Sequence, residues 1–159
     1  MLEEGVRRLL EFTSQRGIRV KVMEFGGSVR SVEEASRLSR VPPSSIVKTI
    51  LVVADGRPAA VLLPGDRRID YRKLARALGA SRVRLAKPDE VERLTGFKPG
   101  EVTPLSDAIA SLTVVADKSL ASVESDVVVG GGSLRHLARV LARDLLAALN
   151  PIVADVSRS

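Results

Sequence analysis

The 159-residue chain has no cysteine, which excludes disulfides, thiolate catalysis and cysteine-bound zinc. Its only histidine, His136, argues against a histidine-based metal site or a Ser-His-Asp triad, so we expect neither a metal nor a cofactor. The formal net charge of +6, with 19 arginines among 25 basic residues, fits a polyanionic partner and equally a charged surface that reflects codon usage.

Length and hydropathy favour one folded domain over residues 1–159. Hydrophobic residues make up 45% of the chain, enough for a core, and no apolar run reaches the roughly 18 residues of a membrane span. The opening MLEEGVRRLLEF is acidic and amphipathic, unlike a signal peptide, so we expect a cytoplasmic protein without a membrane partner. Aromatic residues amount to only 3%, which argues against a base-stacking platform.

The first part of the chain predicts a helix, a strand and a second helix. Apolar residues at helical spacing begin at Leu2, whereas alternating apolar residues over 18–25 indicate a strand. Ser31 and Glu34 have the spacing of a capping box at the start of a helix over 31–39, which the two prolines that follow would terminate.

The next strand, expected over 46–53, contains a lysine among apolar residues. Alternation places Lys48 on the same face as Ile50 and Val52, although both faces look buried. A lysine buried without a partner costs several kcal/mol, so it should face a water-filled cleft or an anionic ligand. Alternatively, it extends from an edge strand into solvent. The turn sequence Asp55-Gly56 predicts that residues 59–66 return antiparallel.

The remaining chain continues to alternate between helix and strand. Asp70 and Gly79 have the pattern of helix-capping residues, and Pro88 and Gly96 bracket a second helix. Between 134 and 150 the spacing fits one long helix, but the opening residues also alternate and could form a last strand. The other expected elements are a helix over 70–80, a strand over 82–86, a helix over 88–96, and strands over 112–117 and 126–132.

The segment 97–106, FKPGEVTPLS, contains two prolines and a glycine. Such a segment predicts a fixed, exposed loop in which several backbone N–H groups can point the same way and hold an oxyanion. It could also be a plain connector.

A series of motifs extends over nearly the whole chain: IVKTILVV, LLPGDRRIDYRKLARALGA, LTGFKPGEVTPLS, DKSL, and the terminal VGGG and RDLLAAL. In their order and spacing, these motifs together resemble the YbaK/ProX-type aminoacyl-tRNA deacylases, which include the editing domain inserted in bacterial prolyl-tRNA synthetases. The resemblance implies an α+β fold with a mixed, strongly curved sheet flanked by helices. It also favours a strand over 134–139 and a terminal helix over 141–149.

The resemblance also implies roles for individual residues. Lys48 matches the lysine that the family requires for deacylation. Gly100 and Pro104 match a Gly-x-x-x-Pro loop whose backbone lies against the aminoacyl ester, and Thr103 precedes that proline as serine or threonine does in relatives. Asp117 matches an aspartate for which we expect a structural role in a turn.

Some positions depart from the family pattern. Gly130 stands where YbaK-like members carry a serine before a glycine pair, and apolar or basic residues around Leu137 replace a pocket aspartate. Because Gly130 and Gly131 are expected to shape the amino-acid pocket, the identity of the amino acid stays open. We expect His136 to be a partly exposed strand residue rather than a catalyst.

We therefore expect a free-standing trans-editing deacylase that hydrolyses the ester at the acceptor end of tRNA mischarged with a small amino acid: alanine, cysteine, proline or serine. This ester is already activated, so hydrolysis needs a positioned water, stabilisation of the oxyanion and exclusion of the wrong acyl groups. An aminoacyl-tRNA synthetase is a further expected partner, and DNA is not. The alternative is a non-catalytic tRNA-binding or synthetase-associated module on the same fold.

Overall fold

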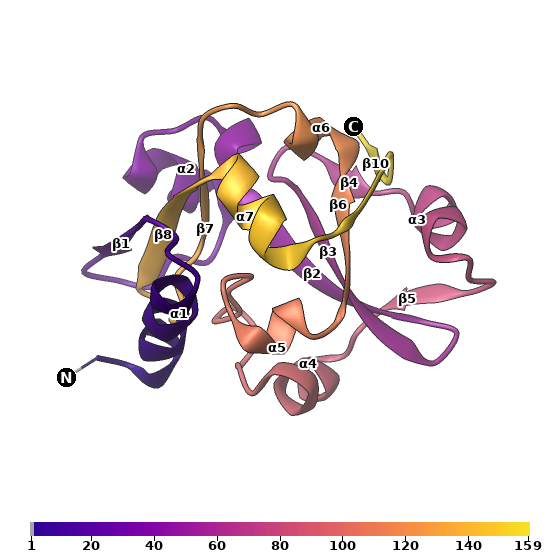
Figure 1. Ribbon diagram of the computed structural model, residues 1–159, viewed down its shortest axis with the longest axis horizontal. Helices are drawn as coiled ribbons and strands as arrows, with labels where there is room; N and C mark the ends of the chain where they lie inside the picture. Colours follow the sequence, from indigo (N-terminus) through magenta and orange to yellow (C-terminus); the bar gives the residue numbers. More distant parts are fainter. Residues whose placement is uncertain (1) are drawn as a thin grey trace.

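Helices and strands alternate along residues 2–159, the part of the chain that the computed structural model describes (Figure 1). Within this part, no helix has the length and apolar character that a membrane span requires. The helices are α1 (Glu4–Gln15), α2 (Val32–Ser39), the 3-10 turn η1 (Pro43–Ser45), α3 (Tyr71–Leu78), α4 (Pro88–Thr95), α5 (Asp107–Ala110), α6 (Lys118–Ala121) and α7 (Ala142–Leu149). The strands are β1 (Val20–Glu24), β2 (Val47–Ala54), β3 (Arg57–Pro64), β4 (Arg68–Ile69), β5 (Val83–Leu85), β6 (Thr113–Asp117), β7 (Asp126–Gly130), β8 (His136–Leu141), β9 (Ile152–Ala154) and β10 (Ser157–Arg158).

The strands pair in three groups. A five-stranded sheet has the order β5-β2-β3-β6-β9, in which β2 is antiparallel to β5 and β3, whereas β6 runs parallel to β3 and β9. A three-stranded antiparallel sheet has the order β1-β8-β7, and β10 pairs with β4. The expected α+β fold with a mixed sheet is confirmed, and the strong curvature of the sheet stays a prediction.

The hairpin between β2 and β3 turns at Asp55 and Gly56, as expected. Both residues have positive φ angles, 48° and 82°, which suit a tight hairpin turn. The Asp55 carboxylate also accepts hydrogen bonds from the backbone N–H groups of Ser81 (2.9 Å) and Arg82 (2.8 Å). These bonds attach the loop before β5 to the end of the hairpin, and they lower the pKa of the Asp55 carboxyl.

The helix ends follow the capping signals with two differences. Ser31 caps α2 by accepting from the Glu34 N–H, but the Glu34 carboxylate accepts from the N–H of Arg30 instead of Ser31. Asp70 caps α3 as expected. Leu2, expected to belong to the first helix, lies before α1 and is 56% exposed, so the expectation for this residue was wrong.

Residues 136–149 form a strand followed by a helix, so the strand alternative for this segment is confirmed. β8 pairs with strands on both sides, with Val140 opposite Val20 in β1 and Val127 in β7. This pairing satisfies the backbone of a segment whose side chains also fit a helix. The elements that the sequence did not predict are two to four residues long, too short for a periodic signal: β4, β9, β10, η1, α5 and α6.

The central hairpin is buried on both faces. Leu51 and Leu62 belong to a core cluster that includes residues of α1, α5 and α7. Val52 and Leu63 belong to a second cluster, which α3 covers through Leu74. Lys48 lies directly opposite Leu63 and therefore stands at the margin of this second cluster.

Candidate active site

Lys48 lies one residue after the start of β2 and is half-buried. Its ammonium group donates a hydrogen bond of 2.5 Å to the backbone carbonyl oxygen of Arg67, in the loop that follows β3. The acceptor is a neutral carbonyl, so the positive charge has no hydrogen-bonded carboxylate. Such a group can reorient toward an anionic or polar ligand without first breaking an ion pair.

The environment of Lys48 lowers the pKa of its ammonium group. Burial is the largest cause because it disfavours the charged form. The carboxylates of Asp66 and Glu33 oppose this effect, whereas the positive charge of Arg68 adds to it. These contributions place Lys48 beside the start of α2 and beside the segment that leads to β4.

A pocket of about 290 Å³ lies where several segments distant in sequence meet. Gly100 from the 97–106 loop, Gly130 from the end of β7 and Leu137 from β8 line it together. Ile46 also lines it, two residues before Lys48 on the same face of the β2 segment. The other lining residues are Val29, Arg30, Ser31, Val32, Ala35, Pro99 and Leu134.

Two glycines of this pocket stand where a side chain would not fit. A Cβ atom on Gly130 would lie 2.5 Å from the carbonyl oxygen of Val102, so β7 and the loop approach each other backbone to backbone. Gly100 has a φ of 87°. The loop conformation and its contact with β7 therefore both depend on glycine.

Three of the expected substrate-binding residues do not line the pocket. Thr103 and Pro104, in the second half of the loop, are buried, and the Thr103 hydroxyl accepts a hydrogen bond of 3.2 Å from the Leu105 N–H. Gly131 is also buried, and a Cβ atom there would lie 2.6 Å from the carbonyl carbon of His136. These residues support the segments that form the pocket.

His136 begins β8, in a strand as expected, but it is only 8% exposed. The expectation that it is partly exposed was therefore wrong, because Ser133 and two carboxylates close over it. Its Nδ1 atom lies 2.5 Å from Ser133 Oγ and 3.5 Å from a carboxylate oxygen of Glu3, and its Nε2 atom lies 3.8 Å from a carboxylate oxygen of Glu24.

Asp117 lies at the end of β6 and makes structural contacts. One carboxylate oxygen accepts a hydrogen bond of 3.0 Å from the Val156 N–H, and the other accepts from the N–H and hydroxyl of Ser119. Burial would raise the pKa of Asp117, but hydrogen bonds from Ser119, Val156 and Ser157 outweigh burial and lower it. The carboxylate thus connects β6, α6 and the C-terminal segment.

A gap in the pairing of β2 lies beside the pocket. Ile46 bridges to Val128 of β7, and β5 pairs with β2 only from Val52 onward, which leaves Thr49 between the two partner strands. The Leu51 carbonyl accepts from Ala86 on this edge, so the N–H and C=O of Thr49 point to the same edge by alternation. The Thr49 hydroxyl oxygen is also buried without a hydrogen-bond partner among the described residues.

The gap opens into a second cavity of about 330 Å³, on the other side of the loop from the first pocket. Thr49 lines this cavity, and Pro99 and Gly100 line both cavities. The sequence did not predict this feature, because 46–53 has the composition of an uninterrupted strand. The donors around Gly100 therefore include side-chain and backbone groups of β2.

Comparison with known proteins identifies the family. The family described as "Aminoacyl-tRNA editing domain" matches residues 27–148, a range that includes Lys48, Gly100 and Gly130. The chain belongs to the aminoacyl-tRNA editing domain family. Membership implies that its substrate is an aminoacyl-tRNA and that its chemistry is deacylation.

Relatives of this editing domain include whole synthetases and a solved structure of similar extent. The chain is 36% identical over 128 residues to the proline–tRNA ligase of Geobacter metallireducens, a match that covers 80% of this chain and 21% of the ligase. It is 40% identical over 116 residues to the ligase of Solidesulfovibrio magneticus, covering 72% and 20%. The chain therefore spans about a fifth of the length of these curated relatives. A crystal structure described as a candidate trans-editing enzyme for prolyl tRNA synthetase has a TM-score of 0.89 and 31% identity, and the match covers 100% of both chains.

Proposed function

We propose that this editing domain is a trans-editing deacylase that hydrolyses the ester of tRNA mischarged with a small amino acid: alanine, cysteine, proline or serine. The observation that carries the proposal is the pocket where Gly100, Gly130 and Leu137 meet beside the Lys48 strand. Action in trans is supported by the solved relative that matches this chain over its full extent and is described as a candidate trans-editing enzyme.

The dimensions and lining of the pocket support the proposed preference for a small amino acid. Its volume of about 290 Å³ must hold the ester and the α-amino group as well as the side chain. The side-chain walls are formed mainly by aliphatic residues such as Val32, Ile46 and Leu137. A large aromatic side chain would clash with these walls, and a small one would fit without displacing the loop.

Hydrolysis of the ester needs a water molecule to attack the carbonyl carbon while the ribose oxygen leaves and takes a proton. Lys48 does not line this pocket, and its ammonium group bonds to the Arg67 carbonyl. By turning from that carbonyl toward the bound substrate, the ammonium would orient the ester or the terminal nucleotide and offset the negative charge on the carbonyl oxygen. Backbone N–H groups around Gly100 supply neutral donors to the same oxygen.

The alternative proposal is a non-catalytic tRNA-binding or synthetase-associated module. The fold permits it, because an editing-domain fold can persist without catalysis. The presence of Lys48 together with the glycine loop and the pocket favours the enzyme.

A panel of mischarged tRNAs tests the proposal. We expect purified protein to deacylate tRNAs that carry small amino acids faster than phenylalanyl or tyrosyl esters. Equal rates across the panel would argue against a shaped pocket. Binding of tRNA without hydrolysis of any ester would support the binding module instead.

A further inference from the structure

The positive charge of the chain is concentrated in one segment. Residues 57–84 contain eight basic and two acidic residues, a net charge of +6 that equals the formal net charge of the whole chain. The remaining residues carry 17 basic and 17 acidic side chains. The excess of positive charge therefore lies in the part of the fold that contains β3, β4, α3 and β5.

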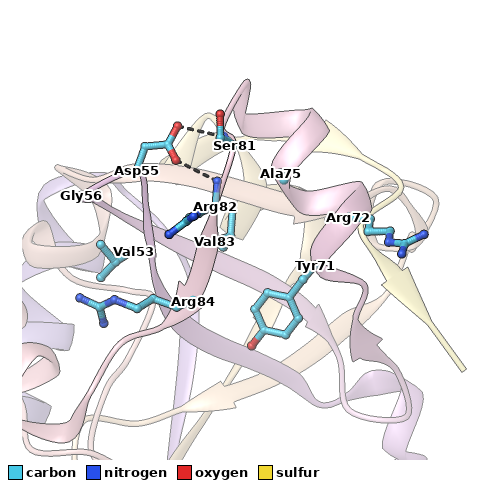
Figure 2. Close-up of a pocket in the computed structure, with 10 residues that line it drawn as sticks. All are labelled: Val53, Asp55, Gly56, Tyr71, Arg72, Ala75, Ser81, Arg82, Val83 and Arg84. Carbon is cyan, nitrogen blue, oxygen red and sulfur yellow. Dashed lines mark hydrogen bonds between the residues drawn. The ribbon is translucent and has the colours of Figure 1, made fainter.

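The segment borders an open groove with a volume of about 720 Å³. Figure 2 shows the groove between α3 and β5, beside the end of the β2–β3 hairpin. The phenol ring of Tyr71 extends from α3 toward β5, while Arg82 and Arg84 project from the opposite side of β5 (Figure 2). The groove contains none of the residues that form the proposed active site.

Two arginines at this groove are available for a ligand. Arg84 is bound to Glu90 by a pair of hydrogen bonds of 2.7 and 2.9 Å. Arg72 and Arg82 are exposed, and neither has a carboxylate partner among the described residues. Asp55, the acidic residue of the groove, is held by the backbone N–H groups before β5 and forms no ion pair with Arg72 or Arg82, although the positive charge of Arg82 contributes to its lowered pKa.

We propose that this surface, with Tyr71 in the groove and with Arg72 and Arg82 pointing outward on its two sides (Figure 2), binds phosphates of the tRNA acceptor arm. The inference rests on the proposed function, which places the esterified end of the tRNA near Lys48. Val53 at the groove is five residue steps along β2 from Lys48, about 17 Å of strand. At this separation, one tRNA could place its esterified end near Lys48 and its phosphate backbone at the groove.

Tyr71 adds a contact of a different kind. It is the only tyrosine of the chain, and it is 41% exposed at the groove. An aromatic ring beside arginines can stack on an unpaired base while the arginines contact the backbone. The same contact would form with any base, so this surface contributes affinity and orientation with little dependence on sequence.

Binding of uncharged tRNA to two double variants tests the proposal. Arg72→Gln with Arg82→Gln removes the two groove charges, and Arg19→Gln with Arg143→Gln removes two exposed charges outside the segment and leaves the same net charge. We expect the groove variant to bind tRNA more weakly and to reduce the slope of log affinity against log salt by about 2. The control variant should resemble the wild type.

A small ester separates docking from catalysis. Hydrolysis of 3′-O-alanyl adenosine, which carries no phosphate, should proceed at the wild-type rate in the groove variant, because Lys48 and the pocket are unchanged. Since the binding measurement uses uncharged tRNA, its result does not depend on whether the chain hydrolyses esters. Tyr71→Phe keeps the aromatic ring and should keep the tRNA affinity, whereas Tyr71→Ala removes the ring and should lower the tRNA affinity several-fold.

Equal tRNA affinity and salt dependence in the groove and control variants would overturn the proposal. So would a groove variant that keeps full tRNA affinity but loses binding to phosphatidylserine vesicles, because the surface would then serve a membrane.

Discussion

Lys48 is a charged residue on a strand whose neighbours are apolar, and its replacement distinguishes packing from chemistry. Lys48→Met keeps the aliphatic bulk beside Ile50 and removes the half-buried ammonium group. We expect ester hydrolysis to be abolished, while stability to urea changes by less than about 1 kcal/mol. Lys48→Arg keeps the charge in a planar group of different shape and should be nearly as inactive. A Lys48→Met protein that deacylates at the wild-type rate would contradict a catalytic role for Lys48.

The lowered pKa of Lys48 predicts that stability and activity change in opposite directions at alkaline pH. Between the lowered folded-state pKa and the unfolded value of about 10.4, the unfolded chain binds more protons than the folded one. The free energy of unfolding attributable to Lys48 therefore rises with pH in this window, while activity falls as the ammonium group loses its proton. Urea unfolding of the wild type and Lys48→Met at several pH values, together with wild-type rates, measures both effects. If the pH dependence of stability is the same in both proteins, the shift does not belong to Lys48.

At the scale of elements, the contact between β7 and the 97–106 loop should determine the geometry of the pocket. Gly130→Ala would place a methyl group 2.5 Å from the Val102 carbonyl oxygen and force the loop away from β7. We expect a loss of about 1–3 kcal/mol in unfolding free energy and a higher KM for small aminoacyl esters. Gly26→Ala, where a Cβ meets nothing within 4 Å, is the matched control. Equal stability and KM in the two variants would contradict a tight contact.

The sequence predicted the elements whose pattern lies within one short segment. The site also depends on contacts between segments that are distant in sequence. The β2–β3 hairpin follows from apolar alternation and its Asp55-Gly56 turn, and α3 follows from Asp70 and its periodic leucines. The gap at Thr49 depends on where β5 and β7 stop pairing with β2, which no local pattern records. The same reason explains the missed strands β9 and β10, whose partners lie far away in sequence.

At the scale of the whole molecule, the C-terminal segment returns to complete sheets that begin much earlier in the chain. β9 extends the central sheet beyond β6, and β10 pairs with β4. The fully buried Val156 lies between these two strands along the chain. The candidate site likewise combines segments around residues 30, 48, 100 and 130. Its residues could be expected from a family resemblance, whereas their meeting in one pocket required the assembled fold.

Asp117 should control how firmly this C-terminal segment is attached. Asp117→Ala would leave the Val156 N–H without its acceptor in a buried position and should cost about 2–3 kcal/mol of unfolding free energy.

Because the pKa of Asp117 is lowered in the folded state, its contribution to stability is present above the usual carboxyl pKa of about 3.9 and is lost as pH falls through the lowered value. Urea unfolding from pH 2 to 6 should therefore show a steeper loss of stability in the wild type than in Asp117→Asn, which keeps an acceptor but cannot titrate. Asp55 and Glu90 also have lowered pKa values, but they remain in both proteins, so the difference between the curves isolates Asp117. Parallel curves would mean that the carboxylate charge does not hold the C-terminal segment in place.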